Sequence, residues 1–215
     1  MNPMQTALEN QKLSLAFVYV IDDESPMRRA IERILLQYKI PCKLFESAET
    51  FLQIAKPDMN GCLILDIRMP GMSGLQLLEV LNARQIELPV IMLSGAGTIS
   101  LAVTAMRTGA IDFVEKPFDT DYLIDRVFYC LNQNALMQES KRQNEEFTKN
   151  LQKLTPRESE VMKLLIQGYT SKHAASKLQI SGRTIEIHRA RIFSKMQVSS
   201  LPNLIRVYLS HMKNY

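Results

Sequence analysis

Residues 63–71 read LILDIRMPG, an apolar run that ends in one aspartate and then turns. Three consecutive apolar residues before Asp66 are typical of a strand buried on both faces, as in a parallel sheet covered by helices. Pro70 and Gly71 predict a turn close behind, which places the Asp66 carboxylate at the crevice where open α/β sheets bind their ligands. An aspartate that only caps a turn is the alternative for this stretch alone.

Length and composition limit the kind of protein this can be. A chain of 215 residues is comfortable for two domains, and 46% hydrophobic with 22% charged residues is typical of a globular protein. No apolar run approaches the roughly 20 residues of a membrane span. No basic stretch precedes an apolar one at the N-terminus, so we expect a cytoplasmic protein without a membrane segment.

The three cysteines, Cys42, Cys62 and Cys130, are odd in number and form no CxxC pair. Neither a disulfide framework nor a zinc site is indicated. We expect buried thiols, and the sequence leaves open whether any of them has a redox role.

The net charge of +4 hides an asymmetry. Residues 155–215 hold ten Lys or Arg against three Glu, whereas the remaining residues hold 16 basic and 19 acidic side chains. A basic segment joined to a mildly acidic one indicates a nucleic-acid binder attached to a different kind of domain.

Apolar strands and helical patterns alternate through residues 16–134. Strands are predicted at residues 16–21, 42–45, 89–93 and 112–114 and in the run that ends at Asp66. Helices are predicted after caps at Ser25, Ser47 and Ser73, around residues 102–106, and from about Asp119. This alternation predicts an α/β fold with a doubly wound, five-stranded parallel sheet.

Polar side chains follow the strands of this sheet at the edge where their carboxyl ends meet: Asp22 and Asp23, Asp66, Ser94 and Lys116. The acids, with the backbone carbonyl of Arg68, suit a hard cation such as Mg²⁺. Ser94 and Lys116 offer a hydroxyl and an ammonium for a phosphoryl oxygen. Asp66 is then left as the nucleophile that accepts the phosphoryl group.

These residues resemble the receiver domains of two-component response regulators. The resemblance rests on VIDDE at 20–24, LDIRMPGMSG at 65–74, Ser94-Gly95 and EKPF at 115–118. It implies a flavodoxin-like fold, phosphorylation of Asp66 by a sensor histidine kinase, a cis Lys116-Pro117 bond, and switching through Ser94 and Phe113. Ala96-Gly97-Thr98 departs from the His-Gly-Asp of close relatives, which affects the details of switching.

Two other functions are weighed against this one. Aspartate-nucleophile phosphatases use a second acid two residues after the nucleophile, and here that position is Arg68. A DNA binder with a decayed, phosphorylation-independent receiver would not need the complete set of acids, Ser94 and Lys116. We therefore expect no enzyme beyond the chain's own phosphoryl transfer to Asp66.

Residues 135–154 contain no Gly or Pro and are rich in Gln, Asn, Lys and Glu, which predicts a helical linker. This linker follows the predicted receiver at residues 16–134, and an N-terminal extension at residues 1–15 precedes the receiver. Phe147, Leu151 and Leu154 recur at helical spacing. Fewer than two heptads is weak support for a coiled coil, so packing within the chain is expected.

Residues 155–215 predict a small all-α domain with a helix-turn-helix. Thr155-Pro156-Arg157-Glu158 forms a capping box, Gly168 ends the first helix, and Thr170 and Ser181 cap the next two. A fourth helix with Leu201 and Leu204 closes the bundle.

The third helix of this domain has one core stripe, Ile185, His188, Ile192 and Met196, with His188 expected to be a satisfied, partly buried histidine. The opposite face predicts the residues that read base edges: Arg183, Glu186, Ile187, Ala190, Arg191 and Ser194. The ends and flanks predict the phosphate contacts: Lys172, Thr184, Arg189 and Lys195.

LTPRESEVMKLLIQG and SGRTIEIHRARIFSKM resemble the LuxR-type output module, with Ser171 and Ala174 as departures. Together the two halves resemble the NarL/FixJ subfamily, more closely its FixJ side. The resemblance implies a transcription factor that binds double-stranded DNA, with RNA polymerase as a further candidate partner. We expect phosphorylation to promote a homodimer through the face from Thr98 to Leu131.

Overall fold

The computed structural model describes residues 16–95 and 99–212. The chain forms two compact units, Met1–Gln138 and Glu139–Tyr215. The extension predicted at residues 1–15 and the Ala96-Gly97-Thr98 departure lie outside the described residues.

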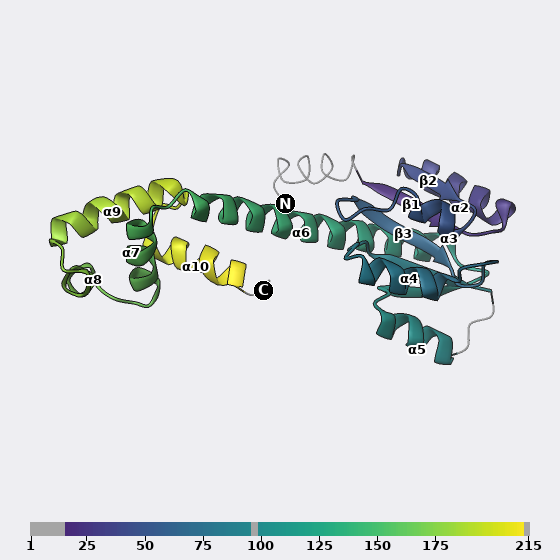
Figure 1. Ribbon diagram of the computed structural model, residues 1–215. Coiled ribbons are helices and arrows are strands. Elements are labelled where there is room, and N and C mark those ends of the chain that lie inside the picture. Colours follow the sequence, from purple (N-terminus) through teal and green to yellow (C-terminus); the bar gives the residue numbers. More distant parts are fainter. Residues whose placement is uncertain (1–15, 96–98, 213–215) are drawn as a thin grey trace. The chain divides into compact units, whose positions relative to one another are not determined.

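The first unit contains a parallel sheet in the order β2-β1-β3-β4-β5 (Figure 1). Its strands are β1 (Phe17–Ile21), β2 (Cys42–Phe45), β3 (Gly61–Asp66), β4 (Val90–Ser94) and β5 (Asp112–Glu115). The first strand, β1, lies inside the sheet; the chain then adds β2 at one edge and crosses back over β1 to β3. This order confirms the doubly wound fold and places its ligand crevice at the carboxyl ends of β1 and β3.

Successive side chains of the central strands enter two separate cores. In β3, Leu63 and Leu65 face one core, whereas Cys62 and Ile64 face the other. All six residues of β3 are buried, as the apolar run before Asp66 predicted. The strand is therefore covered on both faces, and only its end reaches the crevice.

Helices cover both faces of this sheet, with α4 and α5 on one side and α2 on the other (Figure 1). The helices of this unit are α2 (Ser25–Gln37), α3 (Ala48–Leu52), α4 (Gly74–Ala83), α5 (Ile99–Thr108) and the start of α6 (Thr120–Gln152). Leu123 and Val127 of α6 pack in the same core as Ile31 and Leu35 of α2.

Helix caps account for where several of these helices begin. Ser47 and Ser73 each accept the backbone N–H three residues later and form capping boxes with Thr50 and Gln76. The prediction that Ser25 caps α2 was wrong. Ser25 is already helical, and the cap position is Glu24, whose side chain makes no capping hydrogen bond.

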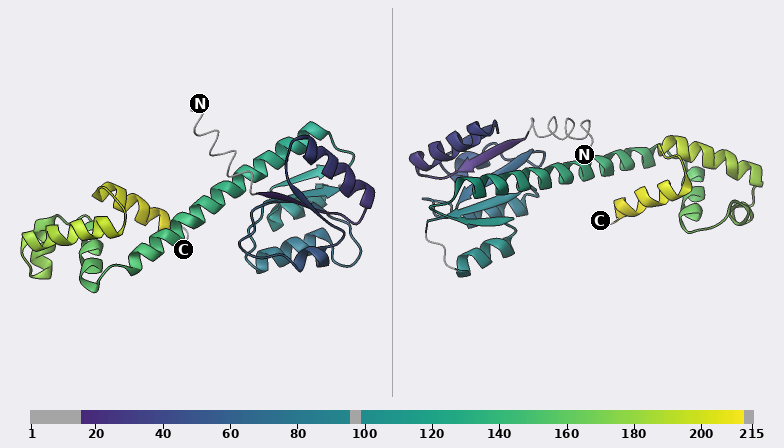
Figure 2. Two further views of the ribbon diagram at one scale, coloured as in Figure 1. Left: turned by 90° about the horizontal axis from the view of Figure 1, so that it is seen from above. Right: turned by 180° about the vertical axis from the view of Figure 1, so that it is seen from behind.

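Helix α6 is a single helix of 33 residues, which includes the predicted fifth receiver helix and most of the predicted linker (Figure 2). Within the first unit it is tied to the start of β3 by two side chains. The fully buried Asn134 accepts the Gly61 N–H through Oδ1 at 2.9 Å, and Gln138 donates to the Met59 carbonyl at 3.1 Å.

The second unit is helical, with a core of its own. Its helices after α6 are α7 (Pro156–Ile166), α8 (Ser171–Leu178), α9 (Gly182–Lys195) and α10 (Leu201–Met212). Thr155, Thr170 and Ser181 are the N-caps, as predicted, and Gln179 turns the chain between α8 and α9 with a φ of 53°. Phe147, near the end of α6, is 3% exposed in this core, so the expectation of packing within the chain is confirmed.

Of the helices in the described parts of the chain, none combines the length and the apolar character required to cross a membrane.

Candidate functional site

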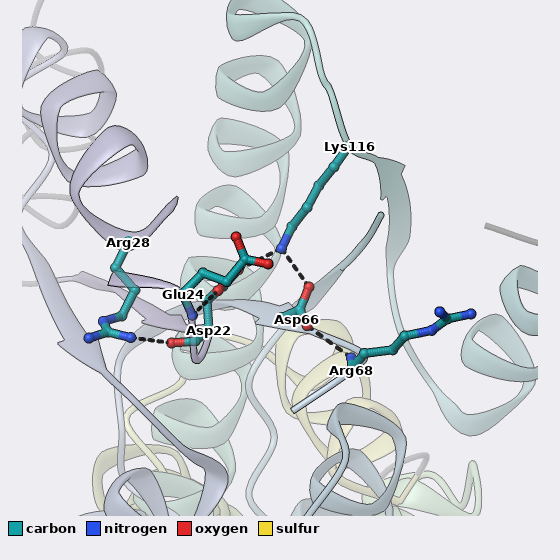
Figure 3. A network of polar contacts seen from close by, with 6 residues as sticks. All are labelled: Asp22, Glu24, Arg28, Asp66, Arg68 and Lys116. Carbon is teal, nitrogen blue, oxygen red and sulfur yellow. Dashed lines mark hydrogen bonds and ion pairs between the residues drawn. The ribbon is translucent and has the colours of Figure 1, made fainter. Parts of the chain in front are cut away.

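One lysine and two aspartates from three strand ends form a compact charged cluster (Figure 3). Lys116, just after β5, places its Nζ 2.6 Å from Asp22 Oδ2 and 2.6 Å from Asp66 Oδ1. Asp22 is fully buried and Asp66 is 5% exposed. The sequence therefore predicted correctly that these three side chains meet at one edge of the sheet.

Backbone groups hold the other carboxylate oxygens of the cluster. The Arg68 N–H donates to Asp66 Oδ2 at 2.9 Å, and the Glu24 N–H donates to Asp22 Oδ1 at 2.8 Å. Arg28 reaches back from α2 to the Asp22 carbonyl at 2.6 Å. Both carboxylates are thus oriented before any ligand binds, while the Arg68 side chain extends away from Asp66 (Figure 3).

Burial and charge act in opposite directions on these groups. Burial raises the pKa of the Asp66 carboxyl, and the hydrogen bond and charge of Lys116 offset only part of that rise. Burial alone would lower the pKa of Lys116. The hydrogen bonds and charges of Asp22 and Asp66 outweigh it, so this pKa is raised and the ammonium stays charged.

Two residues that the sequence reading missed shape the segment after Asp66. A Cβ on Gly74 would lie 2.2 Å from the Asp66 carbonyl oxygen, so only glycine allows α4 to begin this close to the strand end. Glu49 of α3 accepts the Met72 N–H at 3.0 Å and braces the same loop. Gly74 lies in the segment that carries the family resemblance, but its steric role becomes visible only once α4 is placed.

The two predicted switch residues lie on neighbouring strands. Ser94 ends β4 and is 1% exposed, and its carbonyl accepts the Lys116 N–H at 2.7 Å. Phe113 of β5 is partly buried against the core that α4 and α5 cover. The Lys116-Pro117 bond is cis, as the resemblance implied.

The predicted metal ligands are only partly brought together. Across residues 16–95 and 99–212, no three histidine, cysteine or acidic side chains gather as a metal-binding group, and Asp23 is exposed. The assignment of Asp22, Asp23, Asp66 and the Arg68 carbonyl to a metal stays a prediction. The donors do suit Mg²⁺, because two carboxylates against one ammonium leave a net negative charge and free lone pairs.

In the second unit, α9 presents one exposed face. Ile185, Ile192 and Met196 are buried in the core, as predicted. The predicted base-reading residues are all exposed: Arg183, Glu186, Ile187, Ala190, Arg191 and Ser194. These side chains therefore lie on the exposed face of α9, and the assignment of each DNA contact stays a prediction.

Three of the four predicted phosphate contacts have partners within the protein. Lys195 Nζ lies 2.6 Å from Glu158 Oε2, Arg189 Nη1 contacts Glu186 and Ser171, and Thr184 Oγ1 lies 2.8 Å from Ser181 Oγ. Lys172 is exposed. Spacing along a helix identified these residues as flanking but could not show that side chains from α7 and α8 reach them.

The core histidine of α9 differs from its prediction in one respect. His188 is partly buried, but its Nδ1 is buried without a hydrogen-bond partner among the described residues. The expectation that it is satisfied was therefore wrong for this nitrogen.

Glu158, in the second unit, has a role that the sequence showed only in part. It is 2% exposed, and the same Oε2 that pairs with Lys195 accepts the Thr155 N–H at 2.8 Å. The capping box was visible in the sequence. The ion pair, which joins the first turn of α7 to the last turn of α9, was not.

Comparison with known proteins identifies the family of each unit. Residues 18–128 match the response regulator receiver domain, and residues 152–208 match the bacterial regulatory proteins of the luxR family. The chain belongs to the response regulators. It combines a receiver with a LuxR-type DNA-binding domain, an organisation in which a sensor kinase and DNA are the expected partners. Phosphorylation of receiver domains generally depends on Mg²⁺.

Relatives of this response regulator match over nearly their full length. The transcriptional regulatory protein FixJ of Rhizobium meliloti is 37% identical over 193 residues, covering 90% of this chain and 95% of its own. The response regulator protein TodT of Pseudomonas putida is 35% identical over 205 residues, covering 95% and 90%.

Solved structures include similar two-part chains. The response regulator StyR superposes with a TM-score of 0.81 at 34% identity, over 93% of this chain and 99% of its own. Full-length FixJ from B. japonicum gives a TM-score of 0.57 at 36% identity, over 92% and 98%.

We expect Lys116→Met to destabilise the receiver by about 3 kcal/mol, because it leaves two buried carboxylates without their shared cation. Asp66→Asn should recover part of this loss. Since the folded pKa of Asp66 is raised, its ionised form costs stability once the pH rises through that pKa. Urea unfolding of the two single variants and the double variant measures the coupling. Strictly additive effects of the two substitutions would contradict this coupling. Lys56→Met, at a lysine whose side chain is 66% exposed, is the control and should leave stability nearly unchanged.

Glu158→Gln should lower the stability of this regulator's second unit by about 1–3 kcal/mol at neutral pH, because Lys195 loses a charged partner. Burial acts to raise the pKa of Glu158, but Lys195 and Thr155 outweigh it and the pKa is lowered. Its contribution is therefore present above the unfolded pKa and is lost as the pH falls through the folded one. Thermal unfolding against pH tests this, and Glu160→Gln, an exposed neighbour on α7, should leave the profile unchanged.

Proposed function

We propose that this response regulator accepts a phosphoryl group on Asp66 from a sensor histidine kinase, and that the modification controls DNA binding by the second unit. The observation that carries the proposal is the Lys116 ammonium, 2.6 Å from a buried Asp66 carboxylate at the carboxyl edge of the sheet. A buried acid with an oriented cation can act as a nucleophile whose product charge is already compensated.

Asp66 attacks phosphorus with one carboxylate oxygen, and the bond from phosphorus to the donor's histidine nitrogen breaks. The Arg68 N–H holds Oδ2 and the Lys116 ammonium holds Oδ1, so the carboxylate meets the donor in a fixed orientation. Lys116 then neutralises negative charge on the acyl phosphate. The protein catalyses only this transfer to its own side chain.

Asp22, Asp23, Asp66 and the Arg68 carbonyl are the groups that would hold Mg²⁺, with Asp23 exposed beside the buried pair. The ion would supply further positive charge at the phosphoryl oxygens. The residues of this chain orient the nucleophile and limit access of water to it.

Ser94 and Phe113 connect the phosphoryl site to the face formed by α5, β5 and the start of α6. This face carries exposed apolar side chains, including Ile99 at 87%, Val103 at 43% and Met106 at 47%. We propose that phosphorylation shifts it toward a form that pairs with a second copy. Thr98, at the predicted start of the face, lies outside the described residues.

The names of FixJ and TodT describe regulatory proteins, and that role extends to this chain as transcription control in the cytoplasm, with RNA polymerase as a candidate partner. Two output units on paired half-sites gain affinity over one, because each offers a single reading helix.

Mg²⁺ with a small acyl phosphate should phosphorylate the full chain at Asp66, and Asp66→Ala should abolish labelling measured by intact-mass spectrometry. Labelling of Asp23→Ala should no longer increase when Mg²⁺ is added. Labelling of Asp58→Ala, which changes an exposed acid of the same unit, should still respond to Mg²⁺. Undiminished labelling of Asp66→Ala would exclude Asp66 as the acceptor.

DNA binding by the full chain should fall steeply with salt, because a segment with ten basic residues displaces counterions from phosphates. Arg191→Ala should weaken a preferred duplex by about 1–3 kcal/mol relative to random DNA, measured by fluorescence anisotropy. Equal weakening on both would make Arg191 a phosphate contact. Arg206→Ala on α10 is the control.

Sedimentation of the full chain should show a shift from monomer to dimer when phosphodonor is added. Met106→Lys should prevent the shift by placing a charge in the apolar face, whereas Leu36→Lys, on the other side of the sheet, should not. A monomer that still gained DNA affinity would contradict dimer control and favour release of an inhibitory contact.

A further inference from the structure

The exposed face of α9 carries a single acid, Glu186, between arginines at 183 and 191. The Glu186 side chain is 57% exposed, so the acid has no structural role in the core of the second unit. A carboxylate on a helix that approaches phosphates costs binding energy by repulsion. A nearby cation would offset this repulsion, and the carboxylate oxygens could then accept hydrogen bonds from base edges.

Arg189 provides the compensation and fixes the position of the acid. Its Nη1 lies 3.0 Å and 3.2 Å from the two oxygens of Glu186 and 2.9 Å from Ser171 Oγ, at the start of α8. The guanidinium also lies over the Phe193 ring, 5.7 Å from its centroid. Contacts with α8, Glu186 and Phe193 leave the arginine 29% exposed.

The pair is therefore neutral as a unit and is held from α8. Arg189 is poorly placed to add a strong phosphate contact, because its charge is already balanced. Glu186 has its orientation restricted by Arg189 yet keeps its exposed lone pairs, since a carboxylate can accept about four hydrogen bonds. It presents a pre-oriented acceptor on the face that enters the groove.

The edges of the bases respond differently to such an acceptor. Cytosine presents only an amino donor in the major groove, whereas guanine and thymine present acceptors there, which a carboxylate repels. Adenine presents a donor beside an acceptor, so it is an intermediate partner. A fixed carboxylate thus favours cytosine and rejects guanine and thymine.

We propose that Glu186 reads the amino group of a cytosine in each half-site, and that Arg189, anchored by Ser171, is the positioning residue that aims it. This inference rests on the proposed function in one respect, that α9 enters the major groove. It adds the identity of one recognised base and gives Arg189 a role other than phosphate binding.

Selection by the phosphodonor-treated full chain from a pool of duplexes with a randomised core tests the inference. The wild type should enrich a motif with a strong cytosine position. Glu186→Ala should reduce the preference there by roughly tenfold and leave the other positions unchanged. Glu186→Gln should move the preference toward adenine, because an amide can pair with both its donor and its acceptor.

Ser171→Ala separates positioning from general stability. Losing one hydrogen bond to Arg189 should weaken the same cytosine preference about threefold, with little change in binding to random duplexes. Ser176→Ala is the matched control, because Ser176 is an exposed serine of the same helix. A role confined to folding would instead weaken all duplexes alike.

The possible results separate failure of the proposed function from failure of the Glu186 inference. A wild type that binds no duplex would overturn the proposed function and this inference with it. A wild-type motif whose composition does not change in Glu186→Ala would overturn only the inference, as would an effect of Ser171→Ala that is equal on all sequences.

Discussion

The buried acids Asp22 and Asp66 share the ammonium of Lys116 at 2.6 Å each. Two buried carboxylates this close together require a shared cation, because the protein interior screens their repulsion poorly. Asp22 follows β1, Asp66 ends β3 and Lys116 follows β5, so this contact joins two inner strands to one edge strand. The Glu24 and Arg68 N–H groups hold the remaining oxygens of the two carboxylates.

The backbone around Asp66 leaves little freedom. Gly74 allows α4 to start against the Asp66 carbonyl, the Arg68 N–H holds one carboxylate oxygen, and Glu49 ties the loop to α3. The acid therefore keeps its orientation while its pKa is raised by burial. In the proposed phosphoryl transfer, a carboxylate that is fixed, partly desolvated and next to a cation would need little reorganisation.

The second unit also contains ion pairs between acidic and basic side chains. Glu158, in the first turn of α7, accepts the Thr155 N–H and pairs with Lys195, so one buried carboxylate joins the start of α7 to the last turn of α9. Arg189 of α9 pairs with Glu186 on the same helix and also donates to Ser171 of α8. These polar contacts join neighbouring helices beside an apolar core, as the Lys116 contacts join strand ends in the first unit.

The sequence by itself determined the parallel α/β fold, the helix-turn-helix, most caps and the meeting of Asp22, Asp66 and Lys116, because alternation, capping residues and strand ends are local patterns with few topological solutions. It failed at Ser25, where the cap position falls on Glu24, and at His188, whose buried Nδ1 has no hydrogen-bond partner among the described residues. Only the tertiary structure decided that Gly74 must lack a side chain, that Glu158 reaches Lys195 and that Ser171 anchors Arg189. The Glu158–Lys195 and Ser171–Arg189 contacts join residues 37 and 18 positions apart. All three features depend on how the helices and strands pack, which no periodicity along a single segment specifies.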